Sequence, residues 1–369
     1  MREKPQNRGI TMGTNSEYNR SLREQKRKKL HDLEKNLPRY ALPFLDEKEL
    51  TSQINTCIAY AGDLHTFFGF LTESNPLCKN LDPKDVPASV LEQLTFEDIN
   101  EYQRYLSYSD GEFKHLNEEK GIARRMSALR GFFEYGCTHN ILQNNPTVGA
   151  AKRRKMHKKD IIRMNSEEVN QFLDTVRGSK VATDRQKSFC EKTKYRDTAI
   201  LTLLLHTGIR VSECVGLDLE DINFKEHSFS VVRKGGNTAT LYFNEEVAIA
   251  LQDYINLERP HYIESDKEKA LFLSSRKQRM QIRSIQQMVR KYAKIAVPDK
   301  KISPHKMRST YGTALYQQTG DIRLVADVLG HKDINTTAQH YAAMEEEHRK
   351  QAAKIDPYMK TAKVKKNFE

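Results

Sequence analysis

Residues 207–213 read Thr-Gly-Ile-Arg-Val-Ser-Glu, and this stretch joins an apolar segment to a polar turn. The apolar residues of 199–204 predict a long buried helix before it. Gly208 is well placed to end that helix, because glycine readily adopts the left-handed conformation common at helix C-termini. Arg210 follows the helix end directly, where a turn can aim its side chain into a cleft. We expect Glu213 to brace this arginine through an ion pair.

Basic side chains and a tyrosine recur in a fixed order after this stretch. A serine and a proline at 303–304 predict the start of a helix, so His305 and Arg308, three residues apart, share one face of it. Gly330 predicts a further helix end, directly before His331. In chain order the candidate residues are Arg210, His305, Arg308, His331 and Tyr341.

This set of side chains suits attack on a phosphodiester. Negative charge builds on the nonbridging oxygens, and preorganised cationic donors stabilise it in the transition state. Arginine is suited to this task because its planar guanidinium makes paired hydrogen bonds and stays charged. A free tyrosine has a pKa of about 10, so surrounding cations are needed to favour the phenolate as it forms.

Four segments together resemble the tyrosine recombinase (phage integrase) family, at residues 207–213, 303–308, 329–333 and 336–341. The resemblance implies that Tyr341 attacks a DNA phosphodiester to give a 3′-phosphotyrosyl intermediate. It implies that Lys234 is the general acid that protonates the departing 5′ oxygen. Another 5′ hydroxyl then reseals the strand, so neither a nucleotide nor a metal cofactor is expected. The residues implied to hold the phosphate oxygens are Arg210, His305, Arg308 and His331.

The spacing before the tyrosine departs from the family pattern. Tyr341 lies ten positions after His331, whereas family members commonly show nine, and here His340 occupies the ninth. A shift of one residue turns a helical side chain by about 100 degrees, so a bulge or a longer loop must restore its aim. Tyr341 remains the candidate among the 16 tyrosines. The positions that do not fit are Tyr311, Tyr316 and Tyr358.

Composition indicates a polyanionic partner. The net charge is +12 and the pI is near 9.3, which favours double-stranded DNA over an anionic membrane. No apolar run approaches the roughly 20 residues of a membrane span, and residues 1–30 lack the apolar centre of a secretion signal. We therefore expect a cytoplasmic, nucleoid-associated protein.

The cysteine and glycine patterns argue against disulfide, zinc and ATP chemistry. The five cysteines are odd in number and form no C-x-x-C pair, which argues against a disulfide framework and a zinc site. We expect them to be reduced and mostly buried. No G-x-x-x-x-G-K-[ST] loop is present, so ATP use is not indicated.

The expected fold is mainly α with a small antiparallel β-sheet (α+β), arranged as a two-domain DNA clamp. Apolar residues at steps of three and four predict helices from Leu50 to Leu71, over 91–106 and over 122–133, the last ending before Pro146. Strands are predicted at 228–232 and 239–243, joined by a hairpin turn at 234–237. A third short strand is expected at 271–273.

The domain organisation follows from these patterns and from charge. The basic arm is expected either to be disordered or to contact DNA, and the tail either to fray or to pack on a neighbouring subunit. The expected parts are a basic arm at 1–45, a helical (SAM-like) core-binding domain at 46–148, a basic linker at 149–163, a catalytic domain at 164–345 and a tail at 346–369. The residues expected to contact DNA phosphates are Arg124, Arg125, Arg130, Lys152, Arg153, Arg154 and Lys155.

The resemblance implies a site-specific DNA recombinase of the integrase or excisionase type. We expect it to serve a mobile element, with resolution of chromosome or plasmid dimers as an alternative. It would be a monomer when free and a tetramer in the synaptic complex, and an accessory DNA-bending or directionality factor stays open. A type IB topoisomerase would share the chemistry. A non-catalytic DNA-binding protein of the same fold is the remaining alternative.

Overall fold

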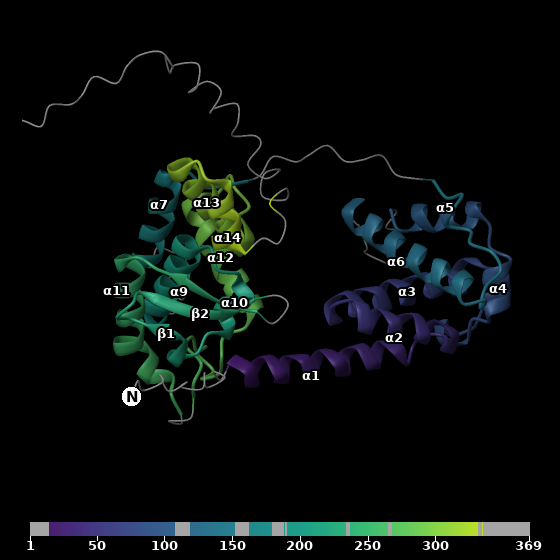
Figure 1. Cartoon of the computed structure of the whole chain (residues 1–369), viewed down its shortest axis with the longest axis horizontal. Helices are drawn as coiled ribbons and strands as arrows, with labels where there is room; N and C mark the ends of the chain where they lie inside the picture. Colours follow the sequence, from purple (N-terminus) through teal and green to yellow (C-terminus); the bar gives the residue numbers. More distant parts are fainter. Residues whose placement is uncertain are drawn as a thin grey trace, which may run out of the picture. The chain divides into compact units, whose positions relative to one another are not determined.

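The chain forms two compact units (Figure 1). One comprises residues 17–159, and the other comprises residues 160–369 together with 1–16. The computed structural model describes residues 15–107, 119–151, 162–178, 188, 190–233, 237–264, 268–330 and 334. Among the helices of these ranges, none has the length and hydrophobicity of a membrane span.

The N-terminal unit is a helical bundle around α3. Helix α3 packs against α2, α5 and α6, and their apolar side chains form an aromatic core. The ring of Phe67 lies 5.2 Å from that of Tyr102 and 6.0 Å from that of Phe133, both edge-on. Leu50 differs from the expected core pattern because it is 88% exposed. The helices are α1 (Asn15–Glu34), α2 (Leu42–Thr51), α3 (Ile54–Ser74), α4 (Ala88–Glu92), α5 (Phe96–Tyr105) and α6 (Glu119–Thr138).

The bundle extends further towards the N-terminus than the sequence pattern indicates. The compact unit begins at residue 17, whereas the sequence pattern predicts a domain start at 46. Leu30, Leu37 and Phe44 are buried in its core, so the second half of the expected arm is part of the bundle. Helix α6 ends at Thr138, several residues before the expected stop at Pro146.

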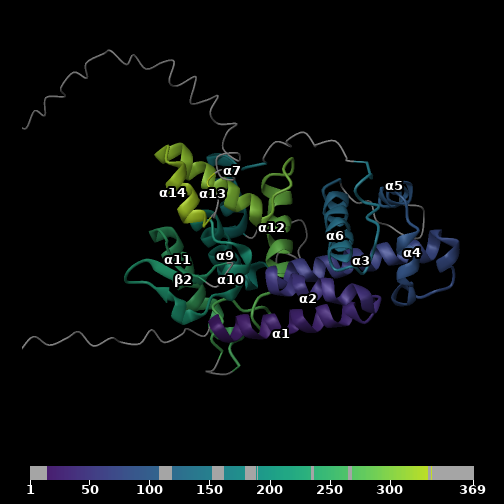
Figure 2. The same ribbon diagram turned by 45° about the vertical axis from the view of Figure 1, so that its right-hand side comes forward.

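The C-terminal unit surrounds a buried helix, α9, which packs against α7, α11 and α13. Helices α13 and α14 lie side by side (Figure 2). The mainly α fold with a small antiparallel sheet is therefore confirmed. The helices are α7 (Ser166–Arg177), α9 (Lys194–Thr207), α10 (Val211–Gly216), α11 (Glu245–Asp253), α12 (Ile282–Ala296), α13 (Pro304–Thr319) and α14 (Ile322–Leu329).

The sheet has the strand order β1-β2-β3, and all its pairs are antiparallel. Its strands are β1 (Ile222–Asn223), β2 (Ser228–Val232) and β3 (Thr238–Tyr242). The predicted hairpin is present, since Val232 pairs with Thr238. The strand expected at 271–273 is wrong: this segment makes an isolated bridge between Leu273 and Arg279, and the third strand is β1.

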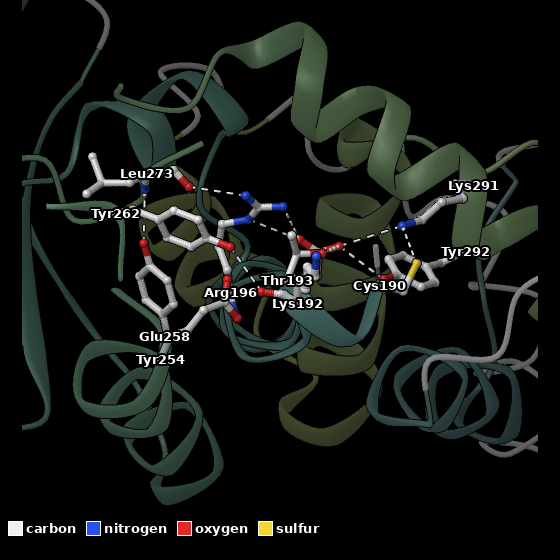
Figure 3. Close-up of polar contacts among 11 residues, drawn as sticks. Cys190, Lys192, Thr193, Arg196, Tyr254, Glu258, Tyr262, Leu273, Lys291 and Tyr292 are labelled. Carbon is white, nitrogen blue, oxygen red and sulfur yellow. Dashed lines mark hydrogen bonds and ion pairs between the residues drawn. The ribbon is translucent and has the colours of Figure 1, made fainter. Parts of the chain in front are cut away.

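A buried polar network fixes the N-terminal end of α9 (Figure 3). Arg196 donates to the Asp197 carboxylate at 2.8 Å and to the Leu273 carbonyl at 3.2 Å. The Tyr292 hydroxyl donates to Asp197 at 3.0 Å, and burial, with this carboxylate nearby, raises the pKa of the phenol. Helix α9 is thereby tied to α12, and its opposite end leads into Gly208 and Arg210.

We expect Asp197→Ala to lower the free energy of unfolding by about 3–5 kcal/mol, because it leaves the buried Arg196 guanidinium without its carboxylate. Denaturant unfolding followed by circular dichroism measures this change. Glu264 pairs with Lys277 at 3.2 Å on the surface, so Glu264→Ala is the matched control and should cost about 1 kcal/mol or less. An equally small loss in Asp197→Ala would show that the network does not stabilise the unit.

Candidate active site

Three of the six predicted catalytic residues lie in the described residues, and all three belong to the C-terminal unit. They are Arg210, His305 and Arg308. Lys234, His331 and Tyr341 lie outside the described residues. So do the predicted DNA contacts Lys152, Arg153, Arg154 and Lys155.

Arg210 is held at the start of α10 by the residue expected to brace it. Its backbone N–H donates to one Glu213 carboxylate oxygen at 3.0 Å, and its Nη1 donates to the other at 2.8 Å. The second terminal nitrogen, Nη2, donates to the carbonyl of Gly330 at 3.0 Å. The Arg210 side chain is 32% exposed, so its guanidinium is both oriented and accessible.

Arg308 lies in the helix predicted to start at 303–304, since Ser303 is the N-cap of α13. The residue is only 6% exposed. Its two terminal nitrogens donate to the carbonyls of Gly208 and Leu329. These carbonyls belong to the C-terminal ends of α9 and α14, where the helix dipole is negative and a buried cation is stabilised.

His305 lies one turn before Arg308 in the first turn of α13 and is exposed. The spacing therefore places both on one face of the helix, as the sequence predicts.

Both predicted glycine caps are confirmed, because Gly208 and Gly330 adopt left-handed conformations with φ of 60° and 61°.

The end of α14 brings together the two arginines that are predicted to be catalytic. Arg308 binds the carbonyl of Leu329 and Arg210 binds that of Gly330, the next residue. His331 follows Gly330 directly in the sequence. The structure thus gathers residues separated by about a hundred positions around the segment that leads into His331. Cationic donors gathered in one place are a feature of sites that stabilise charge on a phosphate.

Tyr311 packs against Gly208, two residues before Arg210, but is poorly suited to attack phosphorus. A Cβ atom on Gly208 would lie 2.5 Å from its ring, so the tyrosine covers that turn closely. Burial raises the pKa of the Tyr311 phenol, which opposes formation of the phenolate. This supports the choice of another tyrosine as nucleophile.

Sequence reasoning missed one arginine of this region. Arg233 follows strand β2, and its Nη1 and Nη2 donate to the carbonyls of Asp327 and Val328 at 3.0 and 2.8 Å. The only available signal was its place beside Lys234 at the end of a predicted strand. Nothing local indicates its partners, which lie more than 90 residues away.

In the N-terminal unit, two predicted DNA contacts share a buried carboxylate. Asp63 is 4% exposed, and it contacts Arg124 closely and Arg125 at 3.4 Å. Burial raises the pKa of Asp63, and the two arginines oppose that shift. The Arg124 side chain is 46% exposed and that of Arg125 is 14% exposed, so Arg124 is the more accessible cation. Arg130 is half-buried.

Known proteins resemble this chain in sequence over most of its length. Residues 162–348 match the model of the phage integrase family. The tyrosine recombinase XerC of Caldanaerobacter subterraneus subsp. tengcongensis is 33% identical over 312 residues, which cover 82% of each chain. The tyrosine recombinase XerS of Lactococcus lactis subsp. cremoris is 28% identical over 353 residues, covering 88% of this chain and 97% of the relative.

Solved structures share the fold. The XerH site-specific recombinase in a post-cleavage complex with palindromic difH substrate superposes with a TM-score of 0.61 and 18% identity, covering 82% of this chain and 79% of XerH. The Tn1549 transposon integrase in complex with a circular intermediate DNA gives a TM-score of 0.57 and 18% identity, covering 79% of this chain and 99% of the integrase.

Proposed function

Because the chain belongs to the phage integrase family of tyrosine recombinases, which break and rejoin DNA, we propose that Tyr341 cleaves duplex DNA through a 3′-phosphotyrosyl intermediate. The protein is thus a site-specific recombinase whose cleavage site is formed by Arg210, His305, Arg308 and His331, with Lys234 as general acid. The observation that carries this assignment is the convergence of Arg210 and Arg308 on two successive carbonyls directly before His331.

The proposed reaction conserves the energy of the broken bond. The Tyr341 oxygen bonds to phosphorus as the phenol gives its proton to solvent water, and the bond to the 5′ oxygen breaks. Lys234 gives that departing oxygen a proton, while Arg210 and Arg308 neutralise the charge on the nonbridging oxygens. A 5′ hydroxyl from another strand then attacks the phosphotyrosine and releases the phenol, so no nucleotide is consumed.

Identification of the linked residue tests the proposal. A labelled suicide duplex, nicked so that the released fragment diffuses away, should trap the protein on DNA. After digestion with trypsin and nuclease, mass spectrometry should find the nucleotide on the peptide that contains Tyr341. A nucleotide on any other residue would reject the assignment.

For the biological role, we propose recombination that resolves chromosome or plasmid dimers, which the similarity to the XerC and XerS recombinases supports. The second candidate is integration and excision of a mobile element. Helix α1 favours this candidate because it offers an additional contact for DNA, formed by the basic, exposed residues Arg23, Arg27, Lys28 and Lys29. Sequencing of covalent adducts captured from genomic DNA separates the two. Dimer resolution predicts one site per replicon, and a mobile element predicts adducts at its two ends.

We further propose that four protomers assemble on two duplexes. The proposed phosphate contacts outside the cleavage site are Arg124, Arg125, Arg130, Lys152, Arg153, Arg154 and Lys155. Arg124 is the strongest of the described candidates because it combines exposure with an orienting contact to Asp63.

A further inference from the structure

Three guanidinium groups hold the C-terminal end of α14. The last carbonyls of a helix lack partners within it and must find donors elsewhere. Here the carbonyl of Val328 accepts from Arg233, that of Leu329 accepts from Arg308 and that of Gly330 accepts from Arg210. Arg233 also donates to the carbonyl of Asp327, which accepts the N–H of Gly330 as well. We propose that Arg233 is a positioning residue for DNA cleavage, which fixes this helix end and thereby the guanidinium groups of Arg210 and Arg308. The inference rests on the proposed roles of those two arginines.

Arg233 is well built for this task. Its guanidinium spans two successive carbonyls at 3.0 and 2.8 Å, a paired geometry that a lysine cannot reproduce. Its own backbone is fixed as well, because its N–H donates to the carbonyl of Asn237 at 2.8 Å, next to the pairing of β2 with β3. Arg233 therefore connects the sheet rigidly to α14.

Gly330 makes the close approach of Arg233 possible. A Cβ atom at this position would lie 2.2 Å from Nη1 and 2.6 Å from Cζ of Arg233. The backbone φ of 61° is also a conformation that residues with a Cβ atom disfavour. Any larger residue at 330 must displace the Arg233 guanidinium from the helix end.

The consequence for cleavage follows from the order of the carbonyls. Arg308 and Arg210 bind the two residues directly after those that Arg233 binds. A shift of this turn would therefore move both phosphate-binding groups together. Misplacement of catalytic groups by about 1 Å can cost about a hundredfold in rate.

The test measures the rate of adduct formation on a suicide duplex at saturating enzyme, together with DNA affinity over a range of salt. Arg233→Ala should slow the rate constant by about tenfold to a hundredfold. The final amount of adduct, the DNA affinity and the salt dependence of that affinity should match those of wild type. The rate constant of Arg233→Lys should lie between those of wild type and Arg233→Ala, because the lysine ammonium reaches one carbonyl at a time. Arg276 is an exposed arginine of the same unit, so Arg276→Ala is the control for charge and should cleave at the wild-type rate.

Two results would overturn the proposal. One is a wild-type rate constant for Arg233→Ala with only a lower end point, which would indicate a smaller folded fraction. The other is a wild-type rate with a salt slope reduced by about one, which would indicate a direct phosphate contact.

A double-mutant cycle with Gly330→Ala tests the same point independently. Gly330→Ala should slow cleavage in the wild-type background, and adding Arg233→Ala should slow it by less than about twofold more, since the guanidinium is already displaced. Additive losses would count against the proposal. The adduct reports the rate whichever tyrosine forms it, so an error in the proposed nucleophile would not be confused with an error about Arg233.

Discussion

Tyr341→Phe is expected to abolish the covalent protein–DNA adduct, with a loss of about 10³-fold or more, while DNA affinity stays close to that of wild type. The substitution removes only the attacking oxygen, and loss of a nucleophile removes the covalent route itself. The arginines that bind phosphate are retained, so binding persists. A denaturing gel of the reaction with a labelled suicide duplex measures the adduct, and a filter or mobility assay measures the affinity.

Tyr311→Phe is the matched control for this prediction. Tyr311 lies against Gly208 in the same unit, and burial raises the pKa of its phenol. Its variant should therefore form the adduct at a rate close to that of wild type. Loss of the adduct in Tyr311→Phe and retention in Tyr341→Phe would reverse the assignment of the nucleophile.

The local chemistry of the site could be predicted from the sequence because it depends on near neighbours. The caps at Gly208 and Gly330 follow from the freedom of glycine at helix ends, and both are present. The contact between Arg210 and Glu213 spans three residues, and it too is present. Such features are encoded within a few positions of each other, so a single sequence is sufficient to find them.

Contacts between distant segments could not be predicted in this way. The contact of Arg124 and Arg125 with Asp63 is one example, because the sequence shows the charge of the two arginines but not the carboxylate they share, about sixty residues earlier. The segment 271–273 was expected to be a strand because it is apolar. Its backbone instead bonds to loop residues, since Leu271 N–H donates to the carbonyl of Leu217 at 2.9 Å. Burial alone does not distinguish these two environments.

The second large effect concerns Arg308, which we expect to contribute to both stability and catalysis. In Arg308→Ala the buried carbonyls of Gly208 and Leu329 lose their donor, which should cost about 1–3 kcal/mol for each that stays unsatisfied. The phosphate loses a cationic donor as well, which should slow cleavage by about 10²–10³-fold. Denaturant unfolding and adduct formation measure the two losses separately.

Arg210→Ala is the matched variant because Arg210 has the same proposed role in a more exposed place. Its side chain is 32% exposed, whereas Arg308 is 6% exposed as a residue. We expect a similar loss of cleavage rate in both variants. Arg210→Ala should also lose stability, because it leaves the carboxylate of Glu213, whose side chain is 5% exposed, with the backbone N–H of residue 210 but without its cation. Arg308→Lys should recover part of the stability but little of the rate, because one ammonium cannot donate to two helix ends in a fixed plane. Wild-type stability of Arg308→Ala would mean that Arg308 does not join α9 to α14, and wild-type cleavage in both alanine variants would exclude them from the phosphate site.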